Sequence, residues 1–410
     1  MLRQMPGLSV EEFALDEARR ALPSSLERFR ESVERWTPFQ TPSYLALWEK
    51  CFGARNRCRI VAGWDRRGEL AAYAPLMRVR GRVGPVPVST LRFIGNNIGY
   101  PGDILHVDVL ATNEDRASVR AVLGHVASTW SLGKWDLGYL PPSSPTPHAA
   151  SEILRDGFVA PDRLVSVPFV SVPLPVEWDE YFASLTANTR SSYRRGLRHL
   201  ESQGPLKVVV ETTPHRARRR VEELIENHLR WLTGTEKEGW FAAGDVREFL
   251  VSSSGSLARE GQFLTSALEL GGTPVAWIHG AADARTFFAQ ISSYDRTYAE
   301  GSPGLVLGLE LVRELIARGF RRVDLGPGST LYKSRLGGVV EPHLRTLGYQ
   351  GWTRRAAWAQ NVIRGRSAGR DSSSGGLGSH LCSNRARAKH SGLYSDIIAG
   401  SEVISKPRRT

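Results

Sequence analysis

The sequence predicts an α/β protein made of two similar units, each a mixed and mostly antiparallel sheet flanked by helices. Three observations support this fold class. Residues 263–294 hold three short apolar runs joined by Gly271-Gly272 and by Asp283, as in strands linked by hairpins. Residues 301–325 then change to a helical period and end in one more strand. The same order of helix, hairpin, further strands, helix and strand occurs in the first half of the chain.

The first half begins with a charged segment, residues 1–35, which we expect to form a helical arm with a helix start at Ser9. Residues 36–170 follow as the first unit. Its patterns predict helices at 43–51 and 114–132, a hairpin of 59–64 with 70–79, and strands at 88–94, 103–110 and 134–140. We find no repeat at the level of single residues, so one large α/β domain remains the alternative to a duplication.

The second unit is expected to span residues 171–358, with a strand at 165–173 just before it. An amphipathic helix carries Val221, Leu224, Ile225, His228 and Leu232 on one stripe. The remaining patterns predict helices at 178–185, 188–201 and 246–258, and strands at 207–211, 263–270, 274–282 and 287–294. These strands have nearly continuous apolar runs, so both faces of the sheet should be covered.

A helix with well-defined ends follows the hairpins. Ser302 suits the N-cap, Pro303 suits the first helical position, and Gly319 suits the position just after the helix. Residues 322–325 read as the next strand, which breaks at Gly326. Backbone N–H groups and the helix dipole favour negative charge at a helix entrance. This order of elements therefore predicts a site for an anionic group near Ser302.

A set of residues in the second half carries a family resemblance. They are Tyr294-Asp295, then Ser302-Pro303-Gly304, then Gly319, Asp324, Gly326 and the pair Tyr332-Lys333. In this order and spacing they resemble the C-terminal half of the GNAT-like acyl-CoA N-acyltransferases, in the branch named after the cellulose-biosynthesis protein CelD. Fem-type aminoacyl transferases are relatives of that branch. The resemblance extends loosely over residues 37–348 and most tightly over residues 189–333.

The resemblance implies tandem GNAT-like units, of which the second is active. The implied reaction moves an acyl group, acetyl in the first instance, from acyl-CoA to an amine or hydroxyl, without a metal and without a covalent enzyme intermediate. Polysaccharide or cell-envelope precursors are the acceptors it suggests. The relatives suggest an alternative, an aminoacyl-tRNA-dependent transfer to a peptidoglycan-type precursor. A third possibility is a non-catalytic scaffold in a glycan-biosynthesis complex, whose mark would be a missing cofactor groove.

For the cofactor, the resemblance points to Ser302, Gly304 and Leu305 as the residues that hold the pyrophosphate of acyl-CoA. Tyr294 ends the strand before them, and the pantetheine would lie along an opened sheet edge. The loop lacks the basic residue and the glycine spacing of the usual GNAT pyrophosphate loop. A purely structural helix start is the alternative, because Ser-Pro-Gly is good capping chemistry in any helix.

Three residues around the following turn are the catalytic candidates. Asp324 ends a strand and could act as general base toward the attacking amine or hydroxyl. Lys333 could stabilise a developing oxyanion or hold a phosphate, and Tyr332 could protonate the leaving thiolate. The structural alternative is that Asp324 pairs with Lys333 or Arg322, or caps the turn.

An arginine stripe is the candidate for acceptor binding. Arg190, Arg194 and Arg198 follow one another at intervals of four residues on the predicted helix 188–201, and the apolar residues Tyr193, Leu197 and Leu200 form its other side. Guanidinium groups in such a row suit a phosphate-bearing acceptor. The alternative is a solvated face, which is the more common fate of arginine-rich helices.

The net charge of +12 does not by itself indicate a nucleic-acid partner. Residues 361–410 contain nine Lys/Arg and three Asp/Glu, so a net +6 lies in this segment alone. The Ser/Gly/Arg-rich composition of residues 359–410 predicts a disordered basic tail. We therefore expect no DNA partner, and tRNA only under the Fem-type alternative.

The remaining composition limits the compartment and the chemistry. Cys51, Cys58 and Cys382 show no C-x-x-C spacing, which favours a reducing compartment and argues against a structural zinc. Neither a secretory signal pattern nor an apolar run of about 18 residues is present, so we expect a cytoplasmic protein without a membrane span. The G-x-S-x-G, Walker and H-E-x-x-H motifs are also missing, which weakens the hydrolase, NTPase and metalloprotease classes.

Overall fold

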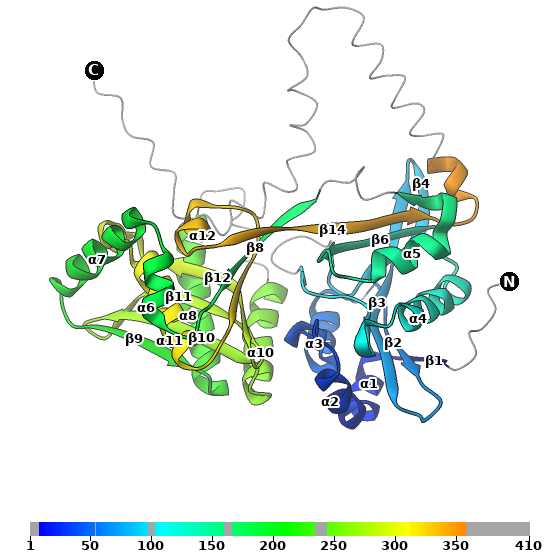
Figure 1. Cartoon of the computed structure of the whole chain (residues 1–410), viewed down its shortest axis with the longest axis horizontal. Coiled ribbons are helices and arrows are strands. Elements are labelled where there is room, and N and C mark those ends of the chain that lie inside the picture. The colour runs from blue at the N-terminus through cyan, green and yellow to red at the C-terminus, as the bar shows by residue number, and fades with distance from the viewer. Residues whose placement is uncertain (1–7, 54, 97–102, 160–165, 234–243, 358–410) are drawn as a thin grey trace, which may run out of the picture. The chain divides into compact units, whose positions relative to one another are not determined.

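The computed structural model describes residues 8–53, 55–96, 103–159, 166–233 and 244–357 (Figure 1). The predicted tail, residues 359–410, lies outside the described residues. The described chain divides into two compact units. The first contains the residues up to Val167 and those from Pro342 onward, and the second contains residues 168–341. No helix among the described residues is long and apolar enough to cross a bilayer.

The first unit is built on a sheet with the strand order β1-β2-β3-β4-β6-β14. Helices α1 and α4 contact β2, α2 and α4 contact β3, and α3 packs against α1. Its strands are β1 (Ser9–Phe13), β2 (Arg57–Trp64), β3 (Leu70–Val83), β4 (Val86–Phe93), β5 (Leu110–Ala111), β6 (Lys134–Leu140), β7 (Phe158–Val159) and β14 (Val339–Tyr349). Its helices are α1 (Leu15–Ala21), α2 (Pro23–Glu31), α3 (Pro42–Phe52), α4 (Arg116–Thr129) and α5 (Thr146–Leu154), with short 3₁₀ turns η1 (Pro38–Gln40), η2 (Thr112–Glu114) and η3 (Arg155–Gly157).

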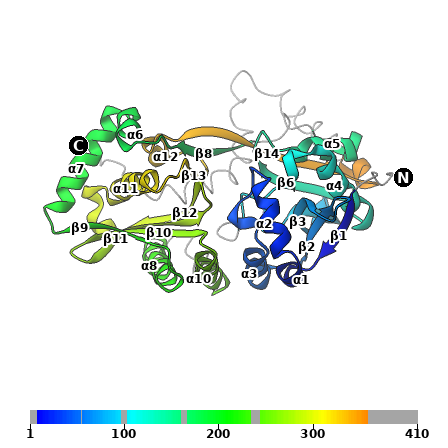
Figure 2. The ribbon, with the colours of Figure 1, turned by 60° about the horizontal axis from the view of Figure 1, so that its bottom comes forward.

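The second unit has a sheet with the strand order β8-β13-β12-β11-β10-β9. Helix α11 covers one face of this sheet, and α8 and α10 lie on the other (Figure 2). The strands are β8 (Val167–Pro173), β9 (Leu206–Glu211), β10 (Phe263–Leu270), β11 (Thr273–Ala282), β12 (Thr286–Tyr294) and β13 (Arg322–Pro327). The helices are α6 (Trp178–Ser184), α7 (Ala187–Glu201), α8 (Pro214–Leu232), α10 (Gly244–Arg259), α11 (Pro303–Ala317) and α12 (Leu331–Arg335), with the 3₁₀ turn η5 (Arg296–Gly301).

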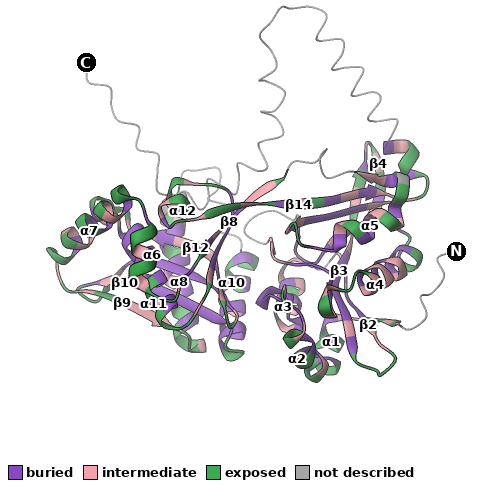
Figure 3. Ribbon diagram, in the orientation of Figure 1, coloured by how far each residue is buried: buried purple, intermediate pink, exposed green. Residues whose placement is uncertain are grey.

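The hairpins predicted from residues 263–294 are confirmed as β10, β11 and β12, which pair antiparallel in sequence order. The first six residues of β10 and the last eight residues of β11 are buried, and both strands are largely purple in Figure 3. Continuous burial follows from helices on both faces. The predicted helix is also confirmed, since α11 begins at Pro303 and Gly319 follows its end with φ +86°.

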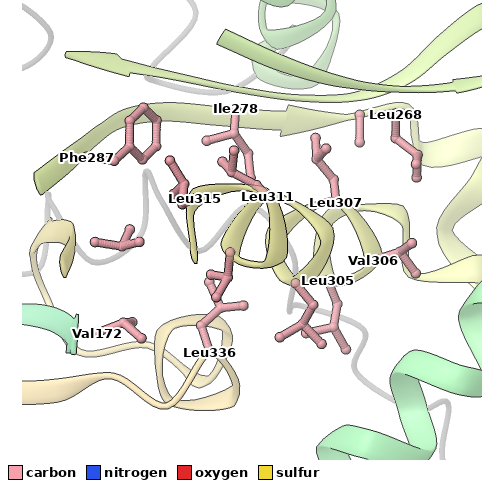
Figure 4. Close-up of a cluster of buried hydrophobic side chains, with 14 of the residues drawn as sticks. Val172, Leu268, Ile278, Phe287, Leu305, Val306, Leu307, Leu311, Leu315 and Leu336 are labelled. Atoms are coloured by element: carbon pink, nitrogen blue, oxygen red, sulfur yellow. The ribbon is translucent and has the colours of Figure 1, made fainter. Parts of the chain in front are cut away.

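The core of the second unit lies around α11. Phe287 and Ile278 project from the sheet toward Leu311 and Leu315 on one side of the helix (Figure 4). Val172 and Leu336 belong to the same cluster and lie on the opposite side of α11 in Figure 4. Each such side chain contributes about 1.5–3 kcal/mol to stability when fully buried. This helix therefore fixes the positions of β12, β13 and α12 relative to one another.

The two units repeat one topology, which confirms the predicted duplication of an α/β fold. In the first unit, the antiparallel strands β2, β3 and β4 are followed by α4 and by β6, which pairs parallel with β4 at Leu91 and Trp135. In the second unit, β10, β11 and β12 are followed by α11 and by β13, which pairs parallel with β12.

The structure also aligns a short sequence repeat that pattern reading missed. The first unit has Lys-Trp-Asp-Leu-Gly at residues 134–138, and the second has Arg-Val-Asp-Leu-Gly at residues 322–326. Asp136 and Asp324 thus occupy the same position, the third residue of the strand that runs parallel to the last strand of the meander. Five residues with three identities carry no significance in a linear comparison. The match becomes significant here because the two five-residue segments lie at equivalent points of the repeated topology.

The predicted end of the second unit at residue 358 is wrong. Residues from Pro342 onward belong to the first unit, because β14 pairs with β6 from Leu344 to Tyr349. Arg345 Nε donates to Asp136 Oδ1 at 2.5 Å, and Gln350 Nε2 donates to the Ala127 carbonyl at 2.9 Å. A strand that pairs with a strand about 200 residues earlier in the chain leaves no local signal of this pairing in the sequence.

Two predictions for the first half also need correction. Residues 9–13 form the edge strand β1, paired with β2, where we expected a helix start, although α1 and α2 follow as helices. Glu12 explains the difference, since it accepts hydrogen bonds from Trp130 Nε1 at 2.8 Å and from Arg57 Nη2 at 2.9 Å. The predicted strand at 103–110 shrinks to the two residues of β5.

These boundaries predict opposite effects for two C-terminal truncations. Ending the chain at residue 365 should leave the melting temperature within about 5 °C of the full-length value, because the removed composition buries little apolar surface. Ending it at residue 341 removes residues 342–349 of β14 and leaves the buried Asp136 without Arg345. We expect a loss of about 3 kcal/mol or more, hence about 10 °C or more, measured by calorimetry or circular dichroism. Equal melting temperatures for the two truncations would contradict this description.

Candidate active site

Strands β12 and β13 separate partway along their length. They pair in parallel at three positions, of which the last is Phe288 with Asp324. Beyond this point β12 continues to Tyr294 along β11, whereas β13 stays paired with β8, which it contacts from Arg322 to Pro327. From Ala289 to Tyr294, β12 therefore has no partner strand on its β13 side among the described residues.

A β-bulge in β12 accompanies the separation. His279 pairs with Ile291 and Gly280 with Ala289, so Gln290 is the extra residue of the bulged strand. Gly280 permits this close approach, because a Cβ on it would come within 2.0 Å of the Phe288 carbonyl oxygen. Sequence reasoning missed Gly280, although a glycine inside an apolar strand is the expected sign of a bulge or of a close backbone contact.

An apolar pocket opens where the strands part. It is bounded by four consecutive residues of β12, by α11, by β13 and by α12. Only Gln290, Ser292 and Tyr332 bring polar side-chain atoms to its wall. The lining residues are Ile278, Phe287, Ala289, Gln290, Ile291, Ser292, Gly308, Leu311, Val312, Leu315, Val323, Leu325, Tyr332 and Leu336. Mostly apolar walls with a few polar groups are typical of small-molecule sites.

The entrance of α11 differs from the prediction in its detail. Ser302 is the N-cap residue as predicted, but its side chain makes no capping hydrogen bond. Its backbone is left-handed instead, with φ 47° and ψ 50°, an uncommon conformation for a residue other than glycine. The Ser302 carbonyl accepts the N–H of Leu305 at 3.0 Å and of Val306 at 3.1 Å. Pro303 has no N–H, so Gly304 holds the most favourable N–H for an anion.

Tyr294 and Gly304 lie next to each other, as expected for two residues of one site. A Cβ on Gly304 would be 3.5 Å from Cδ1 of the Tyr294 ring. Asn227 of α8 fixes the end of β12, because its Nδ2 donates to Ser293 Oγ at 2.8 Å and to the Tyr294 carbonyl at 3.0 Å. Asn227 is buried and was not singled out from the sequence, where an isolated asparagine in a helix gives no signal.

Helix α7 supports the entrance of α11 from outside. A Cβ on Gly196 would come within 2.5 Å of the Gly301 carbonyl oxygen, so α7 passes very close to the chain just before α11. Tyr193 of α7 donates its hydroxyl to the carboxylate of Glu310 in α11. These two contacts explain why the arginine-bearing helix lies beside the predicted cofactor residues.

Asp324 sits at the point of separation and is buried, with 4% of its surface exposed. Its Oδ1 accepts the N–H of Gly326 at 2.8 Å, and its Oδ2 lies 3.8 Å from Arg322 Nη2. Because side chains alternate along a strand, Asp324 points to the face opposite Val323 and Leu325, which line the pocket. The Asp324 carboxylate and the apolar pocket thus lie on opposite faces of the sheet at the point where β12 and β13 separate.

Lys333 is buried in the short helix α12. It is 1% exposed, and its Nζ donates to the carbonyls of Gly326 at 3.0 Å and of Pro327 at 2.6 Å. Burial lowers the pKa of Lys333 to about 7, and the nearby Asp324 carboxylate partly opposes this shift. An ammonium group that titrates near neutral pH beside a buried carboxylate is typical of functional sites.

Tyr332, the neighbour of Lys333, forms part of the pocket wall. Its hydroxyl approaches α11 at Gly308, where a Cβ would be only 2.8 Å from it. Burial raises the pKa of Tyr332, so its hydroxyl stays protonated at neutral pH. The three predicted catalytic residues therefore come together around the end of β13, with Tyr332 on the pocket side.

The arginine stripe is only partly free to meet a ligand. Arg190 donates to the carbonyls of Ala183 and Leu185, which close the end of α6. Arg194 stacks 5.3 Å above the Phe182 ring, and Arg198 Nε donates to the Arg194 carbonyl at 3.3 Å. None of the three lines the pocket. Arg194 and Arg198 are exposed, so acceptor binding remains a prediction for these two, whereas Arg190 has a structural role.

Comparisons with known proteins agree with this geometry. Residues 187–334 match the sequence family described as "Acetyltransferase (GNAT) domain". No curated protein matches the chain. Among solved structures, a conserved protein of unknown function from Bacteroides thetaiotaomicron has a TM-score of 0.52 at 11% identity, over 84% of this chain and 100% of that chain.

Two further similar structures have lower TM-scores. FemX has a TM-score of 0.47 at 10% identity, covering 83% of this chain and 97% of that one. A tandem GNAT protein from the clavulanic acid biosynthesis pathway has a TM-score of 0.44 at 12% identity, with the same coverage of 83% and 97%. The matched range contains every candidate residue of the site, from Arg190 to Lys333. The match to the GNAT acetyltransferase domain family therefore covers residues 187–334, which is most of the second unit.

Proposed function

We propose that the second unit transfers an acyl group from acyl-CoA to an amine or hydroxyl. The observation that carries this proposal is the separation of β12 from β13 beside an apolar pocket, with Asp324 and Lys333 at the point of separation. Beyond Phe288, β12 runs on without β13 beside it among the described residues, and backbone groups along such a strand can bind an extended ligand. The amide groups of a pantetheine arm would lie along Ala289, Ile291 and Ser292, while the apolar walls contact its carbon chain.

The entrance of α11 would hold the pyrophosphate of acyl-CoA. Gly304 leaves room for the anion and carries the N–H best placed for it, and Tyr294 lies against it. The left-handed backbone of Ser302 sets the direction in which the helix begins, and Leu305 follows on the first turn. The positive end of the helix contributes about 0.3–1 kcal/mol to holding an anion, and direct hydrogen bonds add to this.

The proposed reaction needs no covalent enzyme intermediate. The acceptor nitrogen or oxygen attacks the thioester carbonyl carbon, the new bond forms, and the carbon–sulfur bond breaks. Asp324 takes the proton lost by the acceptor, the Lys333 ammonium stabilises the negative charge on the carbonyl oxygen, and the Tyr332 hydroxyl donates a proton to the leaving thiolate. Because Asp324 and the pocket lie on opposite faces of β13, the acceptor would approach from the Asp324 side.

For the acceptor, we propose an amine or hydroxyl of a polysaccharide or cell-envelope precursor, the class implied by the resemblance to the CelD branch. Arg194 and Arg198 would meet an anionic part of that molecule. Both are exposed on α7, which also packs against the α11 entrance through Gly196 and Tyr193. An acceptor held there would lie near the proposed cofactor site on the α11 side of the sheet, and its reacting group would have to extend to Asp324 on the other face.

Calorimetry with acetyl-CoA, free CoA and desulfo-CoA tests the proposal. We expect the full-length protein to bind them, and Gly308→Val to weaken binding at least about tenfold, because its side chain would enter the pocket at the Tyr332 hydroxyl. Gly124→Val is the matched control, since Gly124 lies in α4 of the first unit with nothing within 4 Å of its Cβ position. Absence of binding to every CoA species would overturn the proposal. Binding of aminoacyl-tRNA instead would establish the Fem-type alternative.

A further inference from the structure

Arg322 lies beside the proposed general base, on the face of the sheet from which the acceptor would approach. It precedes Asp324 by two positions on β13, and both residues pair with β12 in one regular register, so their side chains share a face. Arg322 Nη2 lies 3.8 Å from Asp324 Oδ2. The arginine side chain is 43% exposed, whereas the aspartate side chain is 5% exposed. Arg322 is therefore the solvent-accessible neighbour of a buried carboxylate.

The Arg322 guanidinium keeps its hydrogen-bonding capacity. Its contacts with Asp324 at 3.8 Å and with Glu341 Oε2 at 3.9 Å are both too long for hydrogen bonds. Its Nε is buried and has no hydrogen-bond partner among the described residues. A guanidinium carries its N–H donors in a rigid fork, which a carboxylate matches with its two oxygens. Arg322 can therefore bind an anionic group of a ligand.

The equivalent carboxylate of the first unit has a different set of charges around it. The cations that contact Asp136 are Lys134, Arg92 and Arg345. In the second unit, the residue equivalent to Lys134 is Arg322, which lies within 4 Å of two carboxylates, those of Asp324 and Glu341. An ammonium group of a ligand would be attracted to these carboxylates, and a carboxylate of the same ligand would be attracted to Arg322. This arrangement suits a ligand that carries both charges.

We infer that Arg322 positions the acceptor, and that the acceptor is an amine with a carboxylate close to it, as in an α- or β-amino acid or a larger compound that carries this group. This inference rests on the proposed function and specifies its acceptor. The 3.8 Å between Arg322 and Asp324 requires an attacking nitrogen and carboxylate oxygens that are about 3–5 Å apart, which is the span of these compounds.

The reaction balances as in the proposed function. The amine gives its proton to Asp324 and attacks the thioester carbon, the carbon–nitrogen bond forms, and the carbon–sulfur bond breaks. The carboxylate of the acceptor stays on Arg322 and is not changed. Arg322 thus orients the amine toward the base and does not itself take part in the chemistry.

Matched acceptors provide the test. Transfer from acetyl-CoA to glycine, β-alanine and 6-aminohexanoate, and to the amide of each, is followed by the release of free CoA thiol. Hydrolysis without acceptor is subtracted. For each pair, the kcat/KM of the acid divided by that of the amide gives the preference for a carboxylate. Acid and amide also differ in the basicity of their amines, so this ratio is compared between protein variants, where that difference cancels.

Arg322→Gln should reduce the ratio about tenfold or more for glycine or β-alanine, because charge-assisted hydrogen bonds to the carboxylate are lost. For 6-aminohexanoate, whose charged groups lie farther apart, the ratio should change about twofold or less, because a distant exposed charge is screened. Arg321→Gln is the matched control. It removes the same charge from the neighbouring exposed position, where Arg321 Nη1 donates to the Phe320 carbonyl at 3.2 Å. The control should keep the ratio of the unmodified protein for every pair.

The outcomes separate the inference from the proposed function. If Arg322→Gln lowers kcat/KM equally for acids and amides, or if Arg321→Gln reduces the ratio as much, the inference is wrong while acyl-CoA transfer stands. If the protein binds acetyl-CoA but transfers to none of these amines, the acceptor class is wrong. If no CoA species binds, the proposed function fails and the inference fails with it. A ratio that falls only in Arg322→Gln, and only for the short acceptors, supports both.

Discussion

Replacing Asp324 by asparagine should lower kcat about 100-fold or more while the protein stays folded. The amide keeps the size of the side chain and an oxygen that can accept the Gly326 N–H, now 2.8 Å from Oδ1. It removes the negative charge that would take the proton from the attacking group. The acyl-CoA dissociation constant should change little, because Asp324 points away from the pocket. Steady-state kinetics and calorimetry on the same preparation measure both quantities.

The sequence repeat supplies a matched control for this variant. Asp136 occupies the same position in the first unit, but it is held by Arg345 at 2.5 Å, Arg92 at 3.5 Å and Lys134 at 3.6 Å. These cations and the hydrogen bond from Arg345 lower the pKa of Asp136 despite its burial. Asp136→Asn should therefore destabilise the protein by about 1–3 kcal/mol and leave kcat unchanged. If Asp324→Asn instead destabilises the protein and leaves transfer intact, Asp324 is structural.

Much of the fold could be predicted because its signals are local. The hairpins β10 to β12 and the helix α11 follow from apolar runs, turn residues and end signals within a few positions, and each lies where the pattern predicted it. The return of the chain to the first unit through β14 could not be predicted in this way. Residues 342–349 look like any strand, and their pairing with β6 depends on contacts such as Arg345 with Asp136, more than 200 positions apart.

The candidate site was predictable only where its residues lie close together in the sequence. Asp324, Tyr332 and Lys333 were singled out by the resemblance through their order and spacing and remain candidates, and Tyr294 lies next to Gly304. The pocket was not predictable, since its walls come from five elements and its residue types are those of an ordinary core. Gly280 and Asn227 were missed for a related reason. Their roles depend on the Phe288 carbonyl and the end of β12, which only the fold brings to them.

The helix α7 shows that a correctly predicted element does not by itself fix the role of its residues. The predicted spacing of Arg190, Arg194 and Arg198 is real, because all three lie on one helix. Their partners differ, however. Arg190 donates a hydrogen bond to the Ala183 carbonyl at the end of α6, whereas Arg194 stacks on the Phe182 ring. Periodicity gives the face of a helix on which a residue lies, but not whether a neighbouring carbonyl or ring already satisfies it. Of the three, Arg194 and Arg198 are left as candidates for binding the acceptor.

Lys333 should give the reaction a pH dependence near neutrality. Burial lowers its pKa to about 7, so the ammonium that would stabilise the carbonyl oxygen is lost as the pH rises through that value. With saturating acyl-CoA and acceptor, kcat should therefore fall from pH 6 to pH 8.5. Lys333→Met should abolish this decline and lower kcat about 100-fold at pH 6, where the native side chain is charged. A profile with the same shape in both proteins would exclude Lys333 as the titrating group.

Stability provides an independent check on the same side chain, with a defined sign. Below pH 7, Lys333 is protonated in both the folded and the unfolded chain, so the full cost of burying its charge is present. Between about pH 7 and the ordinary lysine pKa of 10.5, the folded protein releases the proton and the unfolded chain keeps it. The contribution of Lys333 to the free energy of unfolding must therefore increase over this window. In the Lys333→Met variant the new side chain cannot titrate, and the Gly326 and Pro327 carbonyls lose their donor at every pH. The difference in melting temperature between the unmodified protein and Lys333→Met should thus shift in favour of the unmodified protein from pH 6 to pH 9, and a constant difference would place the Lys333 pKa outside that window.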